Sequence, residues 1–233
     1  WDKESMQYVM CFFPWVGLAV GILEFLFWKI LEFLGAGSLF RAAVLVLIPV
    51  LVTGGIHLDG YLDTMDALSS WREKERRLEI LKDSHAGAFA VIMGCVWFVA
   101  ALGAAGEIRE NVLPAFCSIF WISRCFSALS VLWFPNANPK GTAAAFGKQA
   151  QKRAVTAVLV VYLALACLFL GWFHPVFLAT VLVEALGWMY YRRMSEKYFG
   201  GITGDLAGWF VSVCEVTGMV WLALCSLGME RLI

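Results

Sequence analysis

Hydrophobic stretches separated by short polar loops run along nearly the whole chain of 233 residues. A helix that crosses a bilayer core about 30 Å thick needs about 20 mostly apolar residues. Seven stretches reach or approach that length, so the pattern predicts an all-α, polytopic integral membrane helical bundle with about seven transmembrane helices. The predicted spans cover residues 9–34, 39–56, 86–105, 112–134, 155–173, 175–191 and 206–227.

The composition agrees with one integral membrane domain over residues 1–233. Hydrophobic residues make up 61% of the chain and charged residues 15%, against about 45–50% and about 25% in soluble domains. A soluble single domain is nearly excluded, and the lipid bilayer is the expected partner of the apolar surface. Because 18 basic residues balance 18 acidic ones, no nucleic-acid partner is expected. The sequence leaves the oligomeric state open, and a homo-oligomer is compatible with it.

Lysine and arginine residues gather in three polar connectors. Residues 57–85, 135–153 and 192–205 hold 12 of the 18 Lys and Arg residues. Cytoplasmic loops of membrane proteins carry such an excess of positive charge. We therefore expect these connectors, and an active site on them, to face the cytoplasm from the cell (inner or plasma) membrane. The first apolar stretch is not preceded by a basic segment or followed by a cleavage site of small residues, so no secretory signal peptide is expected.

Three aspartates stand where the chain leaves the second predicted span. Asp59, Asp63 and Asp66 are spaced i, i+4 and i+7, which places them on one face of a helix. Their mutual repulsion favours neutralisation by a hard cation with oxygen ligands, and Mg²⁺ commonly bridges such carboxylates to substrate phosphates. Acidic residues at membrane depth mark functional sites by default. The alternative is a set of solvated acids on a surface loop, with Asp59 and Gly60 forming a turn.

Polar residues elsewhere in the connectors complete a candidate site. The segment 71–81 reads as a charged helix on the membrane surface. Lys82 could hold a phosphate, and Asp83 could add a carboxylate to the metal region. The glycine-rich loop 200–204 exposes backbone N–H groups at a helix N-terminus, which favours an anion. The alternative makes Thr203 or Asp205 only a helix N-cap.

His57 and two charged residues inside spans are harder to place. His57 lies on the opposite helical face from the aspartates and is interpreted as a loop or supporting residue, not a metal ligand. Arg124 and Glu215 fall within apolar spans, where they could line a catalytic cavity or form a structural ion pair. The motifs GxGxxG, GxxxxGK[ST], HExxH and GxSxG are absent. The acidic motif beside basic residues indicates Mg²⁺-assisted phosphoryl transfer at the membrane surface.

Three longer motifs carry a resemblance to a known family. They are GGIHLDGYLDTMD over residues 54–66, LEILKDSHAG over residues 78–87 and GITGDLAG over residues 201–208. Together, and in this order, they closely resemble cobalamin synthase, the adenosylcobinamide-GDP ribazoletransferase family. The shorter segments FPWVG at 13–17 and ISR at 122–124 also resemble family landmarks. Family members begin with further residues ahead of Met6, so the resemblance implies a longer N-terminus.

The resemblance implies the last assembly step of the nucleotide loop of vitamin B12. A ribose hydroxyl of α-ribazole, or of its 5′-phosphate, would attack adenosylcobinamide-GDP and displace GMP with Mg²⁺ as cofactor. Asp59, Asp63 and Asp66 would bind the metal, while one of them or Asp83 would act as the general base. The implied substrate-binding residues are His57, Lys82, Ser84, Arg124, Thr203, Gly204, Asp205 and Glu215.

Three alternatives remain at the level of the sequence. A CDP-alcohol phosphotransferase also binds metal and a nucleotide diphosphate through helical aspartates, but its Asp-Gly-x-x-Ala-Arg pattern fails at Asp59. A transporter would place charges near the midplane of the membrane and often has an internal repeat. Here the acids cluster at one face and no repeat is evident. A non-catalytic membrane subunit would tolerate replacement of the aspartates.

Overall fold

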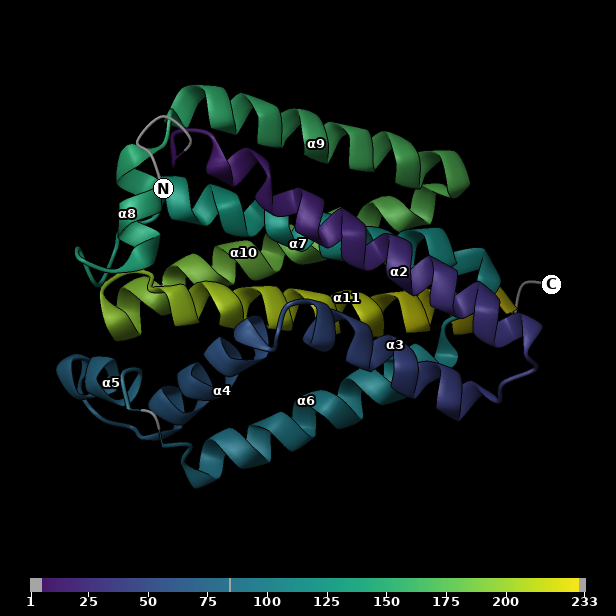
Figure 1. Cartoon of the computed structure of the whole chain (residues 1–233), viewed down its shortest axis with the longest axis horizontal. Coiled ribbons are helices and arrows are strands. Elements are labelled where there is room, and N and C mark those ends of the chain that lie inside the picture. The colour runs from purple at the N-terminus through teal and green to yellow at the C-terminus, as the bar shows by residue number, and fades with distance from the viewer. Residues whose placement is uncertain (1–5, 84, 231–233) are drawn as a thin grey trace.

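The computed structural model describes residues 6–83 and 85–230 and is almost entirely helical (Figure 1). In these ranges the extended structure is limited to one isolated bridge between Asn136 and Ile202, so the all-α prediction is confirmed. Ser84, an expected substrate contact, lies outside the described residues. The α-helices are α2 (Phe13–Phe33), α3 (Ser38–Val52), α4 (Ile56–Ser69), α5 (Lys74–Ile80), α6 (Ala88–Glu107), α7 (Leu113–Trp133), α8 (Thr142–Gln149), α9 (Lys152–Phe173), α10 (Leu178–Phe199) and α11 (Gly204–Glu230), with short 3₁₀ turns η1 (Val9–Cys11), η2 (Glu110–Val112) and η3 (Pro175–Phe177).

The predicted number of about seven transmembrane helices is not confirmed. Five helical segments in the described ranges are long and apolar enough to cross a membrane, and the number rises to six if α3 and α4 form one broken span. The span predicted over residues 39–56 is too long, because α3 ends at Val52 and the chain bends before α4 begins at Ile56. The helix predicted over 175–191 exists as α10, but the charged residues along it leave α10 outside the set of apolar spans.

The chain turns by 92° between α3 and α4. Gly54 and Gly55 occupy the left-handed region, with φ of +62° and +78°, which glycine adopts without the steric cost of a Cβ atom. The hydroxyl of Thr53 donates a hydrogen bond of 2.7 Å to the carbonyl of Pro49, in the last turn of α3. The Gly-Gly pair therefore ends one helix and redirects the next one, which carries all three aspartates of the acidic motif.

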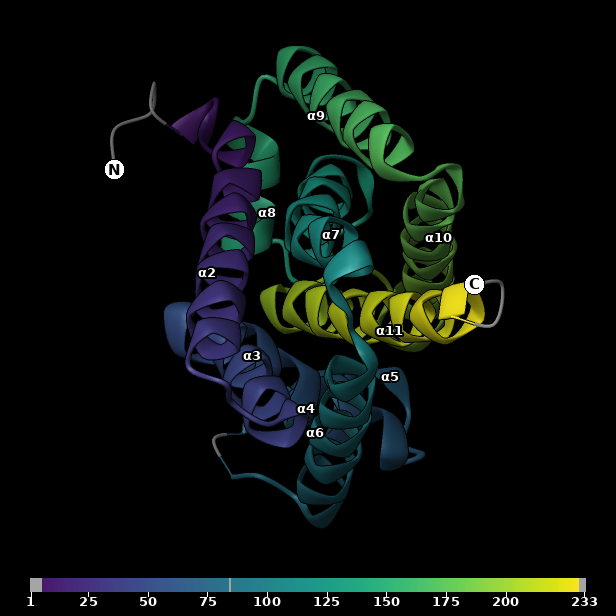
Figure 2. The ribbon, with the colours of Figure 1, turned by 90° about the vertical axis from the view of Figure 1, so that its right-hand side faces the viewer.

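Helix α7 lies at the centre of the bundle, as the end-on view in Figure 2 shows. It packs against α2, α9, α10 and α11, and its span is the most buried of the five. On the other side of α11, the helices α3, α4 and α6 form a second group. Helix α11 is thus shared between the two groups of helices and contacts α4 along its N-terminal half.

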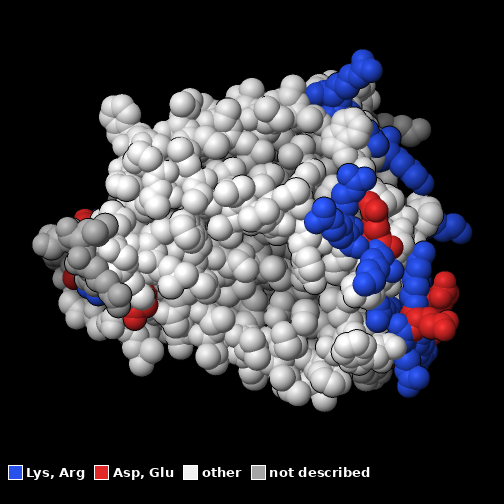
Figure 3. All heavy atoms as spheres, turned by 180° about the vertical axis from the view of Figure 1, so that it is seen from behind, with Lys and Arg blue, Asp and Glu red and all other residues white. Residues whose placement is uncertain are grey.

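Charged side chains are concentrated at the two ends of the bundle (Figure 3). In this view Lys and Arg gather at the end where Figure 1 shows α5 and α8, and the broad middle of the surface lacks charged residues. Exposed apolar residues such as Val160 and Val99 cover the middle of α9 and α6. A band of this kind matches the hydrocarbon region of a bilayer, and we refer to the Lys- and Arg-rich end as the basic end.

Two glycines allow α2 to lie close against α7. A Cβ atom at Gly17 would overlap the carbonyl of Phe120, and one at Gly21 would overlap the carbonyl of Cys117. Small residues at such crossings are typical of membrane bundles, because association there depends on close van der Waals packing. The pair on α2 therefore sets the spacing between the first helix and the central one.

We expect Gly21→Ala to destabilise the protein by about 1–3 kcal/mol, the usual cost of overpacking. The matched control is Gly103→Ala on α6, where nothing lies within 4 Å of the new Cβ atom. That control gains only the better helix propensity of alanine, worth up to about 1 kcal/mol. Thermal unfolding in detergent measures both variants. Equal midpoints for the two would show that the α2–α7 approach is not tight.

Candidate functional site

Four carboxylates lie near one another where α4 crosses the start of α11. Asp63 lies close enough to Asp59, Asp66 and Asp205 for all three charges to act on it. Asp59 in turn acts electrostatically on Asp205. The structure thus brings the acidic motif of α4 together with the glycine-rich loop that precedes α11, 140 residues further along the chain, and we refer to these four residues as the acidic cluster.

Close packing of two helices holds this cluster together. A Cβ atom at Gly60 would overlap the backbone of Asp205, and one at Gly208 would come within 3.1 Å of the carbonyl oxygen of His57. Each helix therefore presents a glycine to the backbone of the other. This approach is close enough to keep carboxylates of the same charge side by side, which repulsion alone would separate.

Asp66 lies against the N-terminus of α6. Its carboxylate occupies the space that a Cβ atom at Gly87 would need, and Gly87 is the residue that caps α6. A helix N-terminus carries a partial positive charge that stabilises a nearby anion. This contact compensates part of the repulsion that Asp66 feels from the rest of the acidic cluster.

The side chains of the acidic cluster are ligands of the kind that a hard cation prefers. All four side chains offer carboxylate oxygens, the ligands that Mg²⁺ prefers. Over residues 6–83 and 85–230, however, no group of three His, Cys, Asp or Glu side chains converges closely enough to enclose a metal ion. Mg²⁺ is commonly held by one or two carboxylates together with water and substrate phosphates, so an open arrangement fits a metal that arrives with its substrate.

Two cavities adjoin the acidic cluster at the basic end. The apolar cavity has a volume of about 520 Å³ and lies between η1, the start of α2, α4, α7, α8 and α11. The polar cavity has a volume of about 230 Å³ and lies between α5 and the connectors before α8 and α11. Four residues line both of them: Thr142, Ala143, Gly204 and Asp205.

Two backbone hydrogen bonds build the polar cavity. The amide of Ala137 donates to the carbonyl of Ile202 at 3.0 Å, and the amide of Ile202 donates to the carbonyl of Pro135 at 2.8 Å. Gly201, with φ of +145°, lies so close to this segment that a Cβ atom would overlap the carbonyl of Pro135. The connectors 135–141 and 200–204 are thereby fixed to each other beside Asp205.

The polar cavity receives several of the expected substrate-binding residues. Lys82, Thr203 and Gly204 line it together with Asn136 and Asn138. Thr203 also accepts a hydrogen bond of 3.2 Å from the amide of Leu206, so it is the N-cap that the alternative interpretation required and a cavity residue as well. Asn136 is not among the residues predicted from the sequence, because only the bridge to Ile202 brings it to this site.

Asp83 forms its hydrogen bonds with His85. Its carboxylate accepts a hydrogen bond of 3.0 Å from the backbone amide of His85 and lies 2.7 Å from Nδ1 of the same residue. These hydrogen bonds hold the pKa of the exposed Asp83 carboxyl below its ordinary value. Asp83 is not among the residues that line the two cavities, and its role as a catalytic carboxylate stays a prediction.

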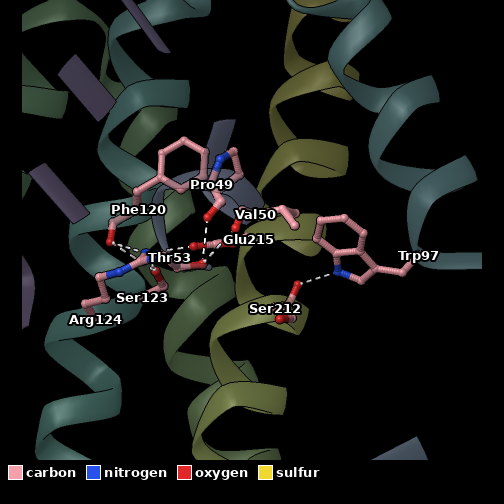
Figure 4. Close-up of polar contacts among 9 residues, drawn as sticks. All are labelled: Pro49, Val50, Thr53, Trp97, Phe120, Ser123, Arg124, Ser212 and Glu215. Carbon is pink, nitrogen blue, oxygen red and sulfur yellow. Dashed lines mark hydrogen bonds and ion pairs between the residues drawn. The ribbon is translucent and has the colours of Figure 1, made fainter. Parts of the chain in front are cut away.

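Arg124 and Glu215 form the ion pair that the sequence left open as one alternative. Nη1 of Arg124 lies 2.7 Å from Oε1 of Glu215, and both side chains are buried. The same nitrogen donates to the carbonyl of Phe120 at 2.9 Å. Figure 4 shows the pair between α7 and α11, beside Thr53 at the break between α3 and α4. Their expected contact with substrate stays a prediction, since neither lines the two cavities.

His57 connects this ion pair with the apolar cavity. It lines that cavity and also a void of about 10 Å³ bounded by Thr53, Arg124 and Glu215, a volume near that of one water molecule. Its ring meets the edge of Phe13 with centroids 5.9 Å apart. His57 thus lies between the apolar cavity and the buried pair, and its role as a supporting residue stays a prediction.

Comparison with known proteins connects this geometry to an enzyme family. Residues 1–223 match the family described as cobalamin-5-phosphate synthase. The chain is 41% identical to the adenosylcobinamide-GDP ribazoletransferase of Lachnoclostridium phytofermentans, over 93% of the chain and 83% of the relative. Relatives of the same name from Clostridium botulinum and a Geobacillus species are 32% and 34% identical, over 94% and 95% of the chain and 88% of each relative. No solved structure matches.

We expect Arg124→Met to destabilise the protein by about 3–5 kcal/mol, because it leaves the Glu215 carboxylate buried without its partner. The double variant Arg124→Met with Glu215→Leu is expected to recover most of this loss, since it removes both charges. Arg192→Met is the control, because the Arg192–Glu196 pair is exposed and such pairs contribute about 0.5 kcal/mol or less. Chemical unfolding in detergent measures the three variants. A double variant as unstable as the single one would argue against this electrostatic account.

Proposed function

The chain belongs to the cobalamin-5-phosphate synthase family of adenosylcobinamide-GDP ribazoletransferases, membrane enzymes of cobalamin biosynthesis, and we propose that it joins α-ribazole, or its 5′-phosphate, to adenosylcobinamide-GDP in an Mg²⁺-dependent reaction. GMP is the second product. The observation that carries this proposal is the acidic cluster beside two cavities. Asp59 and Asp205 line the apolar cavity, and Asp205 also lines the polar cavity, together with a lysine and two asparagines.

The proposed reaction transfers the phosphoryl group that is esterified to cobinamide from GMP to an alcohol. A ribose hydroxyl of the acceptor attacks the phosphorus joined to cobinamide, and a new O–P bond forms there. The bond from this phosphorus to the bridging oxygen breaks, and its electron pair leaves with GMP. The proton of the hydroxyl passes to a carboxylate of the acidic cluster and then to solvent. No oxidant or reductant is needed.

Asp59, Asp63 and Asp66 are the residues proposed to hold Mg²⁺. Three further carboxylates act on Asp63, and a divalent cation relieves the repulsion among such groups. When bound, the metal supplies a positive charge next to the diphosphate, where negative charge develops on the leaving group. The proposal accounts for a costly concentration of like charges at the end of a membrane bundle.

Other side chains of the site would bind and orient the phosphates. Lys82 faces the polar cavity and supplies a positive charge for phosphate oxygens. The first residues of α11, after Thr203 and Gly204, offer backbone amides at a helix N-terminus, which favours an anion. With the phosphates held on this side, the carboxylate of Asp205, which lines both cavities, remains available to the attacking hydroxyl.

The site is proposed to face the cytoplasm. Lys and Arg gather at the end of the bundle that carries α5 and α8, which contain part of the connectors that the positive-inside rule assigns to this side. Nucleotide-linked substrates are cytoplasmic, so this orientation lets them reach the two cavities directly. The membrane would be the cell (inner or plasma) membrane.

We expect Asp63→Asn to lower acceptor-dependent GMP release at least about a hundredfold, as loss of a main source of transition-state charge stabilisation does. The assay uses the purified protein in lipid nanodiscs with adenosylcobinamide-GDP, α-ribazole and Mg²⁺. EDTA should abolish release, and Mg²⁺ in excess should restore it.

Glu79→Gln is the matched control for this assay. Glu79 is an exposed carboxylate on α5 that pairs with Arg76 and is not among the residues that line the two cavities, so GMP release should stay within about twofold of wild type. Full activity of Asp63→Asn, or of the wild type in EDTA, would contradict the proposed role of the acidic cluster.

Cysteine labelling tests the orientation. In a variant without native cysteines, Lys140→Cys before α8 should react with a membrane-impermeant maleimide in inverted vesicles but not in intact cells. Gly37→Cys, in the loop before α3 where a side chain meets no neighbour within 4 Å, should react only from the outside. The reverse pattern would place the site on the wrong side of the membrane for cytoplasmic substrates.

A further inference from the structure

We propose that the apolar cavity binds the aromatic base of the acceptor and that the polar cavity binds the phosphates of the donor, so that the two substrates meet at Asp205. The assignment rests on the proposed function and adds to it which surface selects each substrate. It is carried by the contrast in charge between two cavities that share one rim.

The walls of the apolar cavity suit an uncharged ring system. Aliphatic and aromatic side chains make most of its lining, among them Phe13, Val16, Val131 and Phe146. Its volume of about 520 Å³ lies within the range of pockets that bury drug-sized ligands. A bicyclic base with its sugar is of that size, whereas a complete corrin nucleotide is much larger.

The charges that face the apolar cavity argue against a phosphate there. Asp59 and Asp205 are its charged lining residues, and no lysine or arginine is among the described residues that bound it. Asp205 is not among the proposed Mg²⁺ ligands, so its carboxylate would repel an anion at the end of the cavity that it lines. The same carboxylate is well placed to accept a hydrogen bond from a ribose hydroxyl. The cavity therefore fits a neutral ring at its walls and a hydroxyl at its acidic end.

The polar cavity has the opposite character. Lys82 supplies a positive charge, and Asn136, Asn138 and Thr203 supply polar groups. Oδ1 of Asn136 is buried and has no hydrogen-bond partner among the described residues, although buried polar atoms are normally paired. A ligand with donor and acceptor groups would satisfy such an atom. A nucleotide phosphate with its ribose has both kinds of group.

The shared rim explains how the two substrates would react. Thr142, Ala143, Gly204 and Asp205 line both cavities, so a hydroxyl held in one and a phosphorus held in the other approach each other across Asp205. Holding two reactants in adjoining sites replaces an encounter in solution with a step inside one complex.

Two variants that each alter one cavity test the assignment. Val16→Trp adds a ring at a position that is 41% exposed and lines only the apolar cavity, so the fold should tolerate it. Asn136→Leu keeps the size of the side chain and removes its amide from the polar cavity. Val160→Trp, at a similarly exposed position on α9 outside both cavities, is the control.

Binding and turnover are measured separately in nanodiscs. In calorimetric titration, Val16→Trp should weaken the binding of α-ribazole at least about tenfold, in line with the cost of overpacking, and leave the binding of GMP unchanged. Asn136→Leu should weaken the binding of GMP about tenfold, the loss of about one hydrogen bond, and leave the binding of α-ribazole unchanged. In the GMP-release assay, Val16→Trp should raise only the KM for α-ribazole, and Asn136→Leu should raise only the KM for adenosylcobinamide-GDP. Val160→Trp should match wild type in all of these measurements.

The outcomes separate this inference from the proposed function. If the wild type binds both molecules but Val16→Trp weakens only GMP, or weakens both equally, the assignment of the cavities is overturned while the reaction stands. If Asn136→Leu leaves GMP binding unchanged, the polar cavity is not the phosphate site. If a folded wild type releases no GMP with either form of the acceptor, the proposed function itself fails.

Discussion

The crossing of α4 over the start of α11 positions the chemical groups on which the candidate site depends. Gly60 and Gly208 let the two backbones approach so closely that a methyl group on Gly60 would not fit. Asp59, Asp63 and Asp66 belong to one helix and Asp205 to the other, and this approach makes them neighbours. The same crossing supplies part of the wall of the apolar cavity and the rim that both cavities share.

Packing at this crossing opposes a substantial electrostatic cost. Like charges at the end of a membrane bundle repel each other, and lipid on the flanks of the bundle cannot screen them. The structure offsets part of the cost by placing Asp66 at the N-terminus of α6. Elsewhere it pairs Arg124 with Glu215, so that neither of these two buried charges is left without a partner. A bound divalent cation would offset the remainder, so metal binding and stability of this region should be linked.

The proposed function would combine two kinds of recognition at one end of the bundle. Basic residues around α5 and α8 give this end a positive charge, which would attract anionic substrates. Next to them, an apolar cavity begins where η1 leads into α2 and reaches the acidic cluster. A reaction between a charged nucleotide and an aromatic nucleoside requires both surfaces. In this fold the connectors before α8 and α11 form the polar surface, and the ends of the long helices form most of the apolar surface.

Sequence alone determined the class of the fold and the residues of the acidic motif. Apolar length and helical spacing are local properties, so they identify membrane helices and show that Asp59, Asp63 and Asp66 share a face. Tertiary structure decided what lies opposite that face. The 92° turn at Gly54 and Gly55, the bridge that brings Asn136 to the polar cavity and the pairing of Arg124 with Glu215 all depend on which helices pack together. Hydrophobic periodicity describes one segment at a time, and it therefore cannot specify contacts between residues 90 or 140 positions apart.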